Sequence, residues 1–401
     1  MATSAAITRG QGSRDDGPLG CVSLSGASWA AIQPLSHRET WPSIARVDAR
    51  SWALLVRPSA NRVYAASAPQ LLVAETAVLD ATVLNGRLDD PAVELLGGVP
   101  YVTFASDGDL DERDVGHLST LSGAYALFRR DDSALRPVDL RPLQQLDEDL
   151  LTIQKYVGKT NELFTRLLFN VTVWASASGR DLVAGANRER PIRVLDPLCG
   201  RGSTLHQALV YGCDADGLDV DARDFDAHEA FLKTWLRRKR LKHSAEVVPI
   251  RRDGERLGRR LEVTLGVDKE AWKVGDVRRL GFVHADTRRA GEFFRPATFD
   301  ALVADAPYGV QHGARAGGRL ERNPLHLLQE ALPGWVSLLR PGAALGIAWN
   351  TRVAPREDAV GLLTQAGLEP LDDGPWRGFL HRVDQAIERD IVVARIPAAV
   401  P

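Results

Sequence analysis

Short apolar runs that end in an acidic residue recur along the second half of the chain. Four of them span residues 192–196, 215–221, 281–286 and 299–305. Runs of this length, bounded by turns and rich in small and β-branched side chains, are typical of buried strands. Helical patterns lie between them, and this alternation predicts a mostly parallel sheet with helices on its faces.

Apolar residues spaced three or four apart predict the helices of this half. Three segments show the pattern, 161–174, 222–240 and 325–339. A further strand is expected at 344–349, and residues 381–396 predict an antiparallel strand pair that closes the sheet. The expected architecture is a Rossmann-like α/β domain over residues 151–401.

The first half of the chain is less regular and predicts a smaller α+β domain over residues 21–150. Its strand candidates are 52–56, 71–74 and 101–104. Residues 1–20 are small and polar and are expected to form a flexible tail. The acidic stretch 107–114 is interpreted as a solvated loop, and 137–154 as a linker. Residues 244–280 are interpreted as an inserted hairpin of the second domain.

A glycine-rich turn follows the first strand of the second half, in the sequence Asp196-Pro-Leu-Cys-Gly-Arg-Gly-Ser-Thr204. Gly200 and Gly202 allow tight turning and let a ligand approach the backbone. Ser203 is expected to cap the helix that follows. A strand, a glycine turn and a helix start form a nucleotide-sized crevice. The spacing fits neither a dinucleotide fingerprint nor a P-loop, and an ordinary tight turn is the alternative.

The cofactor candidates in this turn are Asp196, Pro197, Cys199, Gly200 and Gly202. Cys199 is interpreted as a small residue that fits the turn rather than as a nucleophile. The other two cysteines, Cys21 and Cys213, complete no disulfide framework and no metal-binding spacing. No metal site is therefore expected.

Two later acids extend the cofactor site. Asp219 follows the turn by about twenty residues, where a carboxylate accepts hydrogen bonds from both hydroxyls of a ribose. Asp221 is the alternative, although its position before a helical segment fits an N-cap better. Asp286 ends the next apolar run, and an acid there is suited to accept a hydrogen bond from an adenine amino group. A solvated aspartate at a strand end is the alternative.

A second motif, Asp305-Ala-Pro-Tyr-Gly309, follows the fourth run directly. An exocyclic amine on a base is a poor nucleophile because its lone pair is delocalised into the ring. The Asp305 carboxylate and the Ala306 carbonyl are expected to accept its two hydrogens and to orient the nitrogen. Pro307 stiffens the turn, and Tyr308 offers a face on which an extruded base stacks. A plain proline–glycine turn is the alternative.

These motifs, in this order, resemble those of the RNA N2-guanosine methyltransferases, which include the THUMP-associated tRNA guanosine methylases and the methylase domain of the large-subunit rRNA enzymes. The resemblance covers residues 155 to 396, about three-fifths of the chain, and includes the segment 155–162. It implies a class I methyltransferase sheet and S-adenosylmethionine as cofactor. Ala306 departs from the family, which usually has proline there, and residues 1–150 do not resemble a THUMP module.

The resemblance implies methyl transfer to guanine N2 of RNA, with tRNA favoured over rRNA. Two alternatives remain open. One is a DNA methyltransferase acting on adenine N6 or cytosine N4, since the amine clamp is shared chemistry. The other is a cofactor-binding RNA assembly factor without catalysis. The short insertion 244–280 favours RNA, because a DNA enzyme needs a sizeable target-recognition region.

Charge is distributed unevenly along the chain, although the net charge is −2. Residues 1–150 hold 13 arginines against 20 acids, a balance of −7, and the remainder holds 37 bases against 32 acids, a balance of +5. The stretch 223–295 is the most basic. It is expected to lie beside the crevice and to contact phosphates, with a solvated helix end as the alternative.

The sequence has no apolar run of eighteen residues and no signal-peptide pattern near its start. A cytoplasmic enzyme with no membrane partner is therefore expected.

Overall fold

The computed structural model describes residues 49–131, 134–183, 190–306, 315–316, 319–320 and 324–397. Contacts divide the chain into residues 1–45 and residues 46–401, and everything described below belongs to the second unit. The expected tail at 1–20 lies outside the described residues. So does Cys21.

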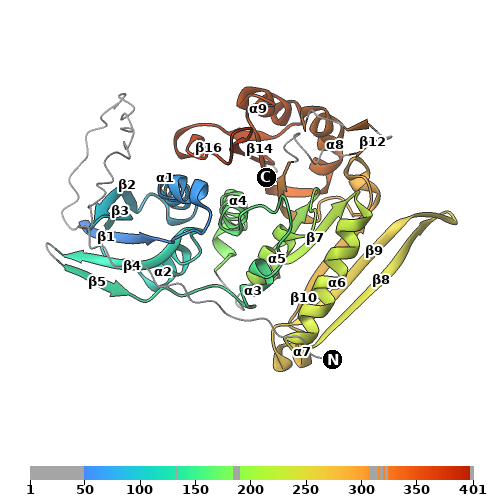
Figure 1. The fold of residues 1–401 in the computed structure, drawn as a ribbon, viewed down its shortest axis with the longest axis horizontal. Coiled ribbons are helices and arrows are strands. Elements are labelled where there is room, and N and C mark those ends of the chain that lie inside the picture. The colour runs from blue at the N-terminus through green and yellow to red at the C-terminus, as the bar shows by residue number, and fades with distance from the viewer. Residues whose placement is uncertain are drawn as a thin grey trace, which may run out of the picture. The chain divides into compact units, whose positions relative to one another are not determined.

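The larger sheet contains five parallel strands at its centre. They are β6 (Arg193–Asp196), β7 (Asp214–Asp219), β10 (Val277–His284), β11 (Phe299–Asp305) and β14 (Leu339–Asn350). The strand order along the sheet is β15-β17-β14-β11-β6-β7-β10-β9-β8 (Figure 1). At one end, β17 (Glu388–Arg395) runs antiparallel between β14 and β15 (Glu369–Leu371).

This order, with one antiparallel strand placed before the last edge strand, is the Rossmann-like class I methyltransferase arrangement. It confirms the fold expected for the second half. The expected C-terminal pair is also present, because β16 (His381–Arg382) pairs antiparallel with β17.

The insertion is confirmed as a hairpin and also extends the sheet. Strands β8 (His243–Arg252) and β9 (Glu255–Gly266) pair with each other, and β9 pairs antiparallel with β10. The short helix α7 (Lys269–Val274) follows the hairpin. The insertion is therefore part of the sheet's edge (Figure 1).

Alternate side chains of the parallel strands pack into two separate hydrophobic cores, one on each face of the sheet. The sequences of these strands are therefore apolar on both faces. Val194, Ala215 and Phe282 face the side covered by α4 (Glu162–Ala175), α5 (Ser203–Val210) and α6 (Ala222–Arg238). Leu195, Leu218 and Val283 face the side covered by α8 (Pro324–Leu338) and α9 (Arg356–Gln365).

The predicted helices are present, and their starts have physical causes. The Asn161 side chain accepts from the Leu163 N–H and begins α4, and the Asp221 side chain accepts from the Arg223 N–H and begins α6. The expected cap at Ser203 is wrong. Gly202, with φ of 84°, is the cap residue of α5, and Ser203 is already the first helical residue.

The smaller sheet is wholly antiparallel, in the order β2-β3-β1-β4-β5. Its strands are β1 (Ala49–Val56), β2 (Leu88–Leu96), β3 (Val99–Asp107), β4 (Ala124–Asp131) and β5 (Ala134–Val138). Helices α1 (Arg62–Leu79) and α2 (Glu112–Leu118) accompany it, so this half is α+β as expected.

Three details of the first half differ from the sequence interpretation. The strand candidate 71–74 lies inside α1, because its apolar residues continue a helical burial pattern that Asn61 caps. The acidic stretch 107–114 is not only solvated loop: Asp111 and Asp114 form a capping box that starts α2. The linker 137–154 contains the short helix α3 (Asp149–Thr152).

Short elements complete the described chain. They are η1 (Asp80–Leu84), η2 (Gly179–Asp181), η4 (Thr287–Glu292), η5 (Gly374–Arg377), β12 (Arg315–Ala316) and β13 (Arg319–Leu320). No helix among the described residues is long and apolar enough to cross a membrane.

A buried carboxylate joins α1 to α4. Glu75 accepts hydrogen bonds from the Ser122 backbone N–H at 3.0 Å, from the Ser122 hydroxyl at 2.6 Å and from the Asn170 amide at 2.8 Å. Burial is the main cause that raises the pKa of Glu75 to about 7. Burying a carboxyl without an ion pair favours its neutral form.

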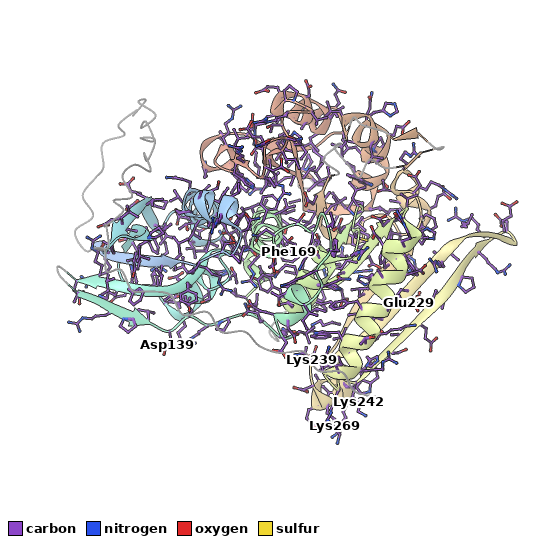
Figure 2. All side chains as sticks on the ribbon, in the orientation of Figure 1. Asp139, Phe169, Glu229, Lys239, Lys242 and Lys269 are labelled. Atoms are coloured by element: carbon purple, nitrogen blue, oxygen red, sulfur yellow. The ribbon has the colours of Figure 1, made fainter. Side chains whose placement is uncertain are left out.

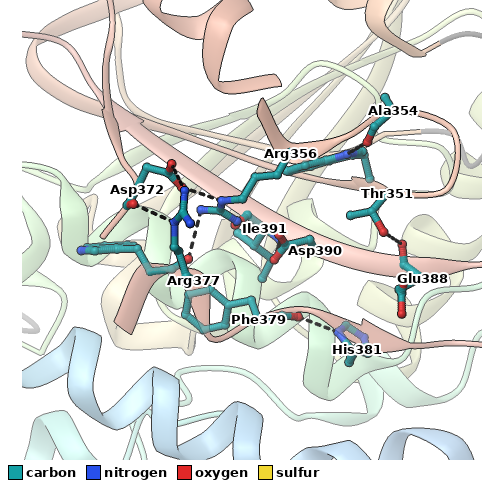
Figure 3. A network of polar contacts seen from close by, with 12 residues as sticks. Thr351, Ala354, Arg356, Asp372, Arg377, Phe379, His381, Glu388, Asp390 and Ile391 are labelled. Atoms are coloured by element: carbon teal, nitrogen blue, oxygen red, sulfur yellow. Dashed lines mark hydrogen bonds and ion pairs between the residues drawn. The ribbon is translucent and has the colours of Figure 1, made fainter. Parts of the chain in front are cut away.

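An arginine in α9 organises the C-terminal strands (Figure 3). Arg356 donates to Asp372 at 2.6 Å and to Asp390 at 2.7 Å, and therefore ties β17 to the segment before η5. Beside it, the His381 ring nitrogen Nδ1 lies 2.9 Å from the Phe379 carbonyl oxygen. These bonds fix the end of the sheet that borders β14.

Candidate active site

The predicted motifs meet at the carboxyl edge of the parallel strands. Asp196 ends β6, Asp219 ends β7 and Asp305 ends β11. From β6 the chain crosses to β7 on one side, whereas β11 pairs on the other side of β6. Such a reversal of strand order is where open α/β sheets bind ligands.

The glycine turn has the geometry that its residues predict. Gly200 and Gly202 have φ of 50° and 84°, which favour glycine. A Cβ on Gly202 would lie 2.3 Å from the His228 ring, so the turn packs directly on α6. A Cβ on Gly200 would meet nothing within 4 Å, so its Cβ direction faces open space.

Pro197 and Cys199 are buried beneath this turn. The Cys199 N–H donates to the Leu218 carbonyl at 3.0 Å, which joins the turn to β7. A Cβ on Gly217 would lie 2.8 Å from the Cys199 sulfur. Cys199 is therefore packed, as its interpretation as a small residue suggested, and burial raises the pKa of its thiol.

Asp219 is held in place by the turn. Its two carboxylate oxygens accept from the Gly200 N–H and the Asp221 N–H, each at 2.8 Å. Asp221 itself caps α6, as its alternative interpretation states. Burial is the largest cause that raises the pKa of Asp219 to about 6. Each oxygen retains a second lone pair, and the residue is only partly buried, so the carboxylate fits a ligand that carries two hydroxyls.

Asp196 lies deeper. It is 2% exposed, and it accepts from the Leu198 N–H at 3.0 Å. Burial raises its pKa to about 7. The buried side chain of Asp196 therefore holds the backbone of the glycine turn in its conformation.

Asp286 caps the short helix η4 and forms an ion pair with Arg288, whose Nε donates at 2.9 Å. Hydrogen bonding from Arg288 holds the pKa of Asp286 below its usual range. An adenine amino group would have to share this carboxylate with the guanidinium.

Asp305 is partly buried and contacts a residue 145 positions earlier. The Thr160 hydroxyl donates to its Oδ2 at 2.5 Å. Ala306 is 1% exposed, and its N–H donates to the Ala348 carbonyl of β14 at 2.8 Å. Pro307 and Tyr308 lie outside the described residues.

The segment 155–161 borders both motifs, and its individual residues were not predicted to act in the site. The Tyr156 hydroxyl lies 3.4 Å from the Ser203 hydroxyl at the start of α5, and the Arg201 guanidinium lies 4.6 Å from the centre of the Tyr156 ring. With Thr160 on Asp305, this segment joins the glycine turn to the end of β11. The sequence signal for this segment was the resemblance of residues 155–162 to the family, and that resemblance gave no role to any single residue.

The part of the basic stretch around the end of α6 does not lie beside the crevice, where the sequence placed it. Helix α6 starts at the carboxyl edge beside Asp219 and runs back along the sheet, so Arg237 and Arg238 lie in its last turn. His243 pairs with Leu265 on β9, near the amino end of β10. Seventeen helical residues span roughly 25 Å. The cluster that follows α6 therefore lies at the opposite edge from the crevice.

Other bases of the stretch 223–295 are engaged in ion pairs. Arg259 pairs with Asp226, Arg260 with Asp216, Arg278 with Asp276, Arg288 with Asp286 and Arg289 with Glu292. The charges of these five arginines are therefore balanced by acids of the protein itself.

No family model and no curated protein matches this sequence. Solved structures match with low similarity. A TehB-like SAM-dependent methyltransferase from Corynebacterium glutamicum is 16% identical, with 54% of this chain and 85% of that chain covered and a TM-score of 0.30. Magnesium protoporphyrin IX methyltransferase from Synechocystis, with bound SAM, is 13% identical, with coverage of 60% and 86% and a TM-score of 0.33.

A third match is spermidine synthase from Thermotoga maritima, which is 12% identical, with 67% of this chain and 68% of that chain covered and a TM-score of 0.33. Likenesses this low carry no argument about activity. The fold assignment rests on the strand order, and the site on its residues.

Proposed function

We propose that this protein is an S-adenosylmethionine-dependent methyltransferase that modifies an exocyclic base amine, guanine N2 of RNA, with tRNA as the favoured substrate. One observation carries the proposal. A partly buried carboxylate, Asp305, stands at the end of β11 next to the strand-order reversal, where a ligand on the glycine turn would lie. It is positioned by a neutral hydroxyl from Thr160.

The cofactor residues support the proposal. Asp219 would accept the two ribose hydroxyls, Gly200 would leave room for the ligand, and Asp286 would contact the adenine amino group. When bound, S-adenosylmethionine supplies an electrophilic methyl group. Everything else needed for transfer is orientation and water exclusion, which the residues at the carboxyl edge of the sheet would provide.

The chain's own contribution is to prepare the amine. The Asp305 carboxylate accepts one amine hydrogen and the Ala306 carbonyl accepts the other, so the nitrogen lone pair points at the methyl group. Bound S-adenosylmethionine would supply the methyl group to this nitrogen, and the surplus proton of the methylated amine would leave to water. Tyr308 would stack on the base. Orientation of this kind strengthens as the transition state forms.

RNA is preferred to DNA because of the insertion. Strands β8 and β9 extend the main sheet, so residues 244–280 form no separate recognition domain among the described residues. Cytoplasmic RNA is the expected target. An assembly factor without catalysis is the second candidate, and the alanine at position 306 motivates it.

The test is transfer of labelled methyl to purified tRNA, rRNA and duplex DNA in parallel, with Asp305→Ala as the matched variant. We expect label in RNA, tRNA above all, and at least a hundredfold less with the variant. If only the DNA becomes labelled, DNA replaces RNA as the assigned substrate. Tight cofactor binding with no label in any nucleic acid would favour the assembly factor.

A further inference from the structure

Four basic side chains gather in and just after the last turn of α6, at the edge of the sheet opposite the crevice. This α6-end cluster consists of Arg237, Arg238, Arg240 and Lys242, and all four are exposed. Lys269, at the start of α7, lies close in the chain to Gly266, whose N–H donates to the Lys242 carbonyl at 3.0 Å. Figure 2 shows Lys239, Lys242 and Lys269 at this same end of the molecule.

Most of the charge of the cluster is not paired with acids among the described residues, although Arg238 interacts electrostatically with Asp149. Lys239 between its members pairs with Asp149 at 2.6 Å. In contrast, the four side chains of the cluster make no ion pair within the part of the chain that the structure describes. Arg237 donates only to the Lys233 carbonyl and the Thr234 hydroxyl. The positive charge is thus directed to solvent, unlike that of the paired arginines nearby.

The backbone conformation of Arg240 is a second, independent observation. It has φ of 56°, the left-handed conformation that favours glycine. The Leu241 N–H donates to the Leu236 carbonyl at 3.2 Å, so Arg240 occupies the position after the helix end where glycine is usual. Bases inside a last helical turn are explained by the helix dipole. An arginine at the glycine position costs stability, so the dipole does not explain it.

We propose that the α6-end cluster binds the phosphate backbone of a folded RNA helix whose far end presents the target base to the crevice. This inference rests on the proposed function and narrows its substrate class. Roughly 25 Å of helix separates the two places. A structured RNA arm reaches both, whereas a short oligonucleotide that carries the target base reaches only the crevice.

The test compares Arg240→Gly and the triple variant Arg237→Gln/Arg238→Gln/Arg240→Gly with wild type. The control is Arg136→Gln, which removes one exposed charge from the smaller sheet. We expect the triple variant to raise KM for folded tRNA about tenfold and to reduce the salt slope of tRNA binding by about two to three, since each phosphate contact contributes roughly 0.7–0.9. Its kcat, its cofactor affinity and its activity on a short oligonucleotide should stay at wild-type values.

A measurement of stability distinguishes a role of Arg240 in binding RNA from a role in stabilising the fold. Arg240→Gly should raise Tm by about 2 °C while it weakens tRNA binding. A lower Tm for this variant, or a KM and salt slope equal to those of Arg136→Gln, would overturn the inference. So would equal binding of wild type to tRNA and to polyglutamate, which would indicate a general polyanion surface. If wild type transfers no methyl group at all, the proposed function is overturned instead. The inference about the α6-end cluster is still tested in that case, because tRNA binding is measured without methyl transfer.

Discussion

The hydroxyl of Thr160 donates a hydrogen bond to the carboxylate of Asp305. Thr160 precedes α4, and Asp305 ends β11 at the centre of the sheet. The bond holds one oxygen of the carboxylate and so fixes the orientation of the group. Thr160 is therefore a positioning residue for the group that the proposed chemistry depends on.

Thr160→Val removes this bond and keeps the shape of the side chain. We expect kcat to fall about tenfold to a hundredfold, since a hydrogen bond to a charged group is worth about 1.5–3 kcal/mol. Thr160→Ser should restore most of the rate. Cofactor affinity, measured by calorimetry, should not change in either variant. A valine variant with wild-type kcat would show that the carboxylate needs no support.

Cofactor binding should weaken in acid. The pKa of Asp219 is about 6 in the folded protein, so its ionised form prevails above this pH and is lost below it. Ionised oxygens accept hydroxyl hydrogen bonds best, and affinity should therefore fall by up to about tenfold per pH unit below pH 6.

Asp219→Asn is the control, because Asp196 still titrates in it. Its affinity should be weaker at pH 8 and much flatter between pH 7 and 5. The comparison is made by titration calorimetry at each pH. Equal pH dependence in wild type and Asp219→Asn would assign the effect to another group.

The Glu75 carboxyl predicts a pH dependence of stability. Its folded pKa is about 7, against an ordinary value of 4.5, so the folded state binds more protons between these values. Stability from this group is present below pH 4.5 and decreases as pH rises through 7. The shift corresponds to about 3 kcal/mol.

Glu75→Gln keeps the hydrogen bonds, since the amide oxygen accepts from Asn170 and the amide nitrogen donates to the Ser122 hydroxyl. We expect the variant to be more stable than wild type at pH 8 and to lose the slope between pH 5 and 8. Urea unfolding at several pH values between 5 and 8 measures the stability of both proteins and its slope with pH. A wild-type protein that becomes more stable from pH 5 to 8, with the same slope in the variant, would contradict this reading of Glu75.

Proline at position 306 should harm this protein. The resembled family usually has proline there, but in this protein the Ala306 N–H donates to the Ala348 carbonyl, and proline has no N–H. We expect Ala306→Pro to lose about 1–3 kcal/mol of stability. Ala306→Gly keeps the donor and serves as the control. A proline variant as stable as the glycine variant would contradict the expectation.

The sequence predicted the main sheet because its strands are apolar on both faces and end in acids, a pattern that survives without tertiary information. It predicted α4 and α6 because their apolar residues recur every three or four positions, and the structure adds that Asn161 and Asp221 cap them. It misassigned residues 71–74, since a four-residue apolar run fits a strand and a helix equally well.

The site was predicted less completely than the fold. The turn and the ends of β7 and β11 were identified, but the contact of Thr160 with Asp305 joins residues 145 positions apart, and no local pattern encodes it. The position of the basic cluster was misjudged, although a long helix that returns along a parallel sheet must end at the opposite edge.

The central claim is that Asp305 holds a base amine during methyl transfer. The most direct measurement is nucleoside analysis of tRNA after incubation with wild type and with Asp305→Ala, at RNA and cofactor concentrations that saturate both. We expect N2-methylguanosine with wild type and at least a hundredfold less with the variant, at equal cofactor affinity. Methyl groups on ribose oxygens or ring carbons, or equal N2-methylguanosine from both proteins, would contradict it.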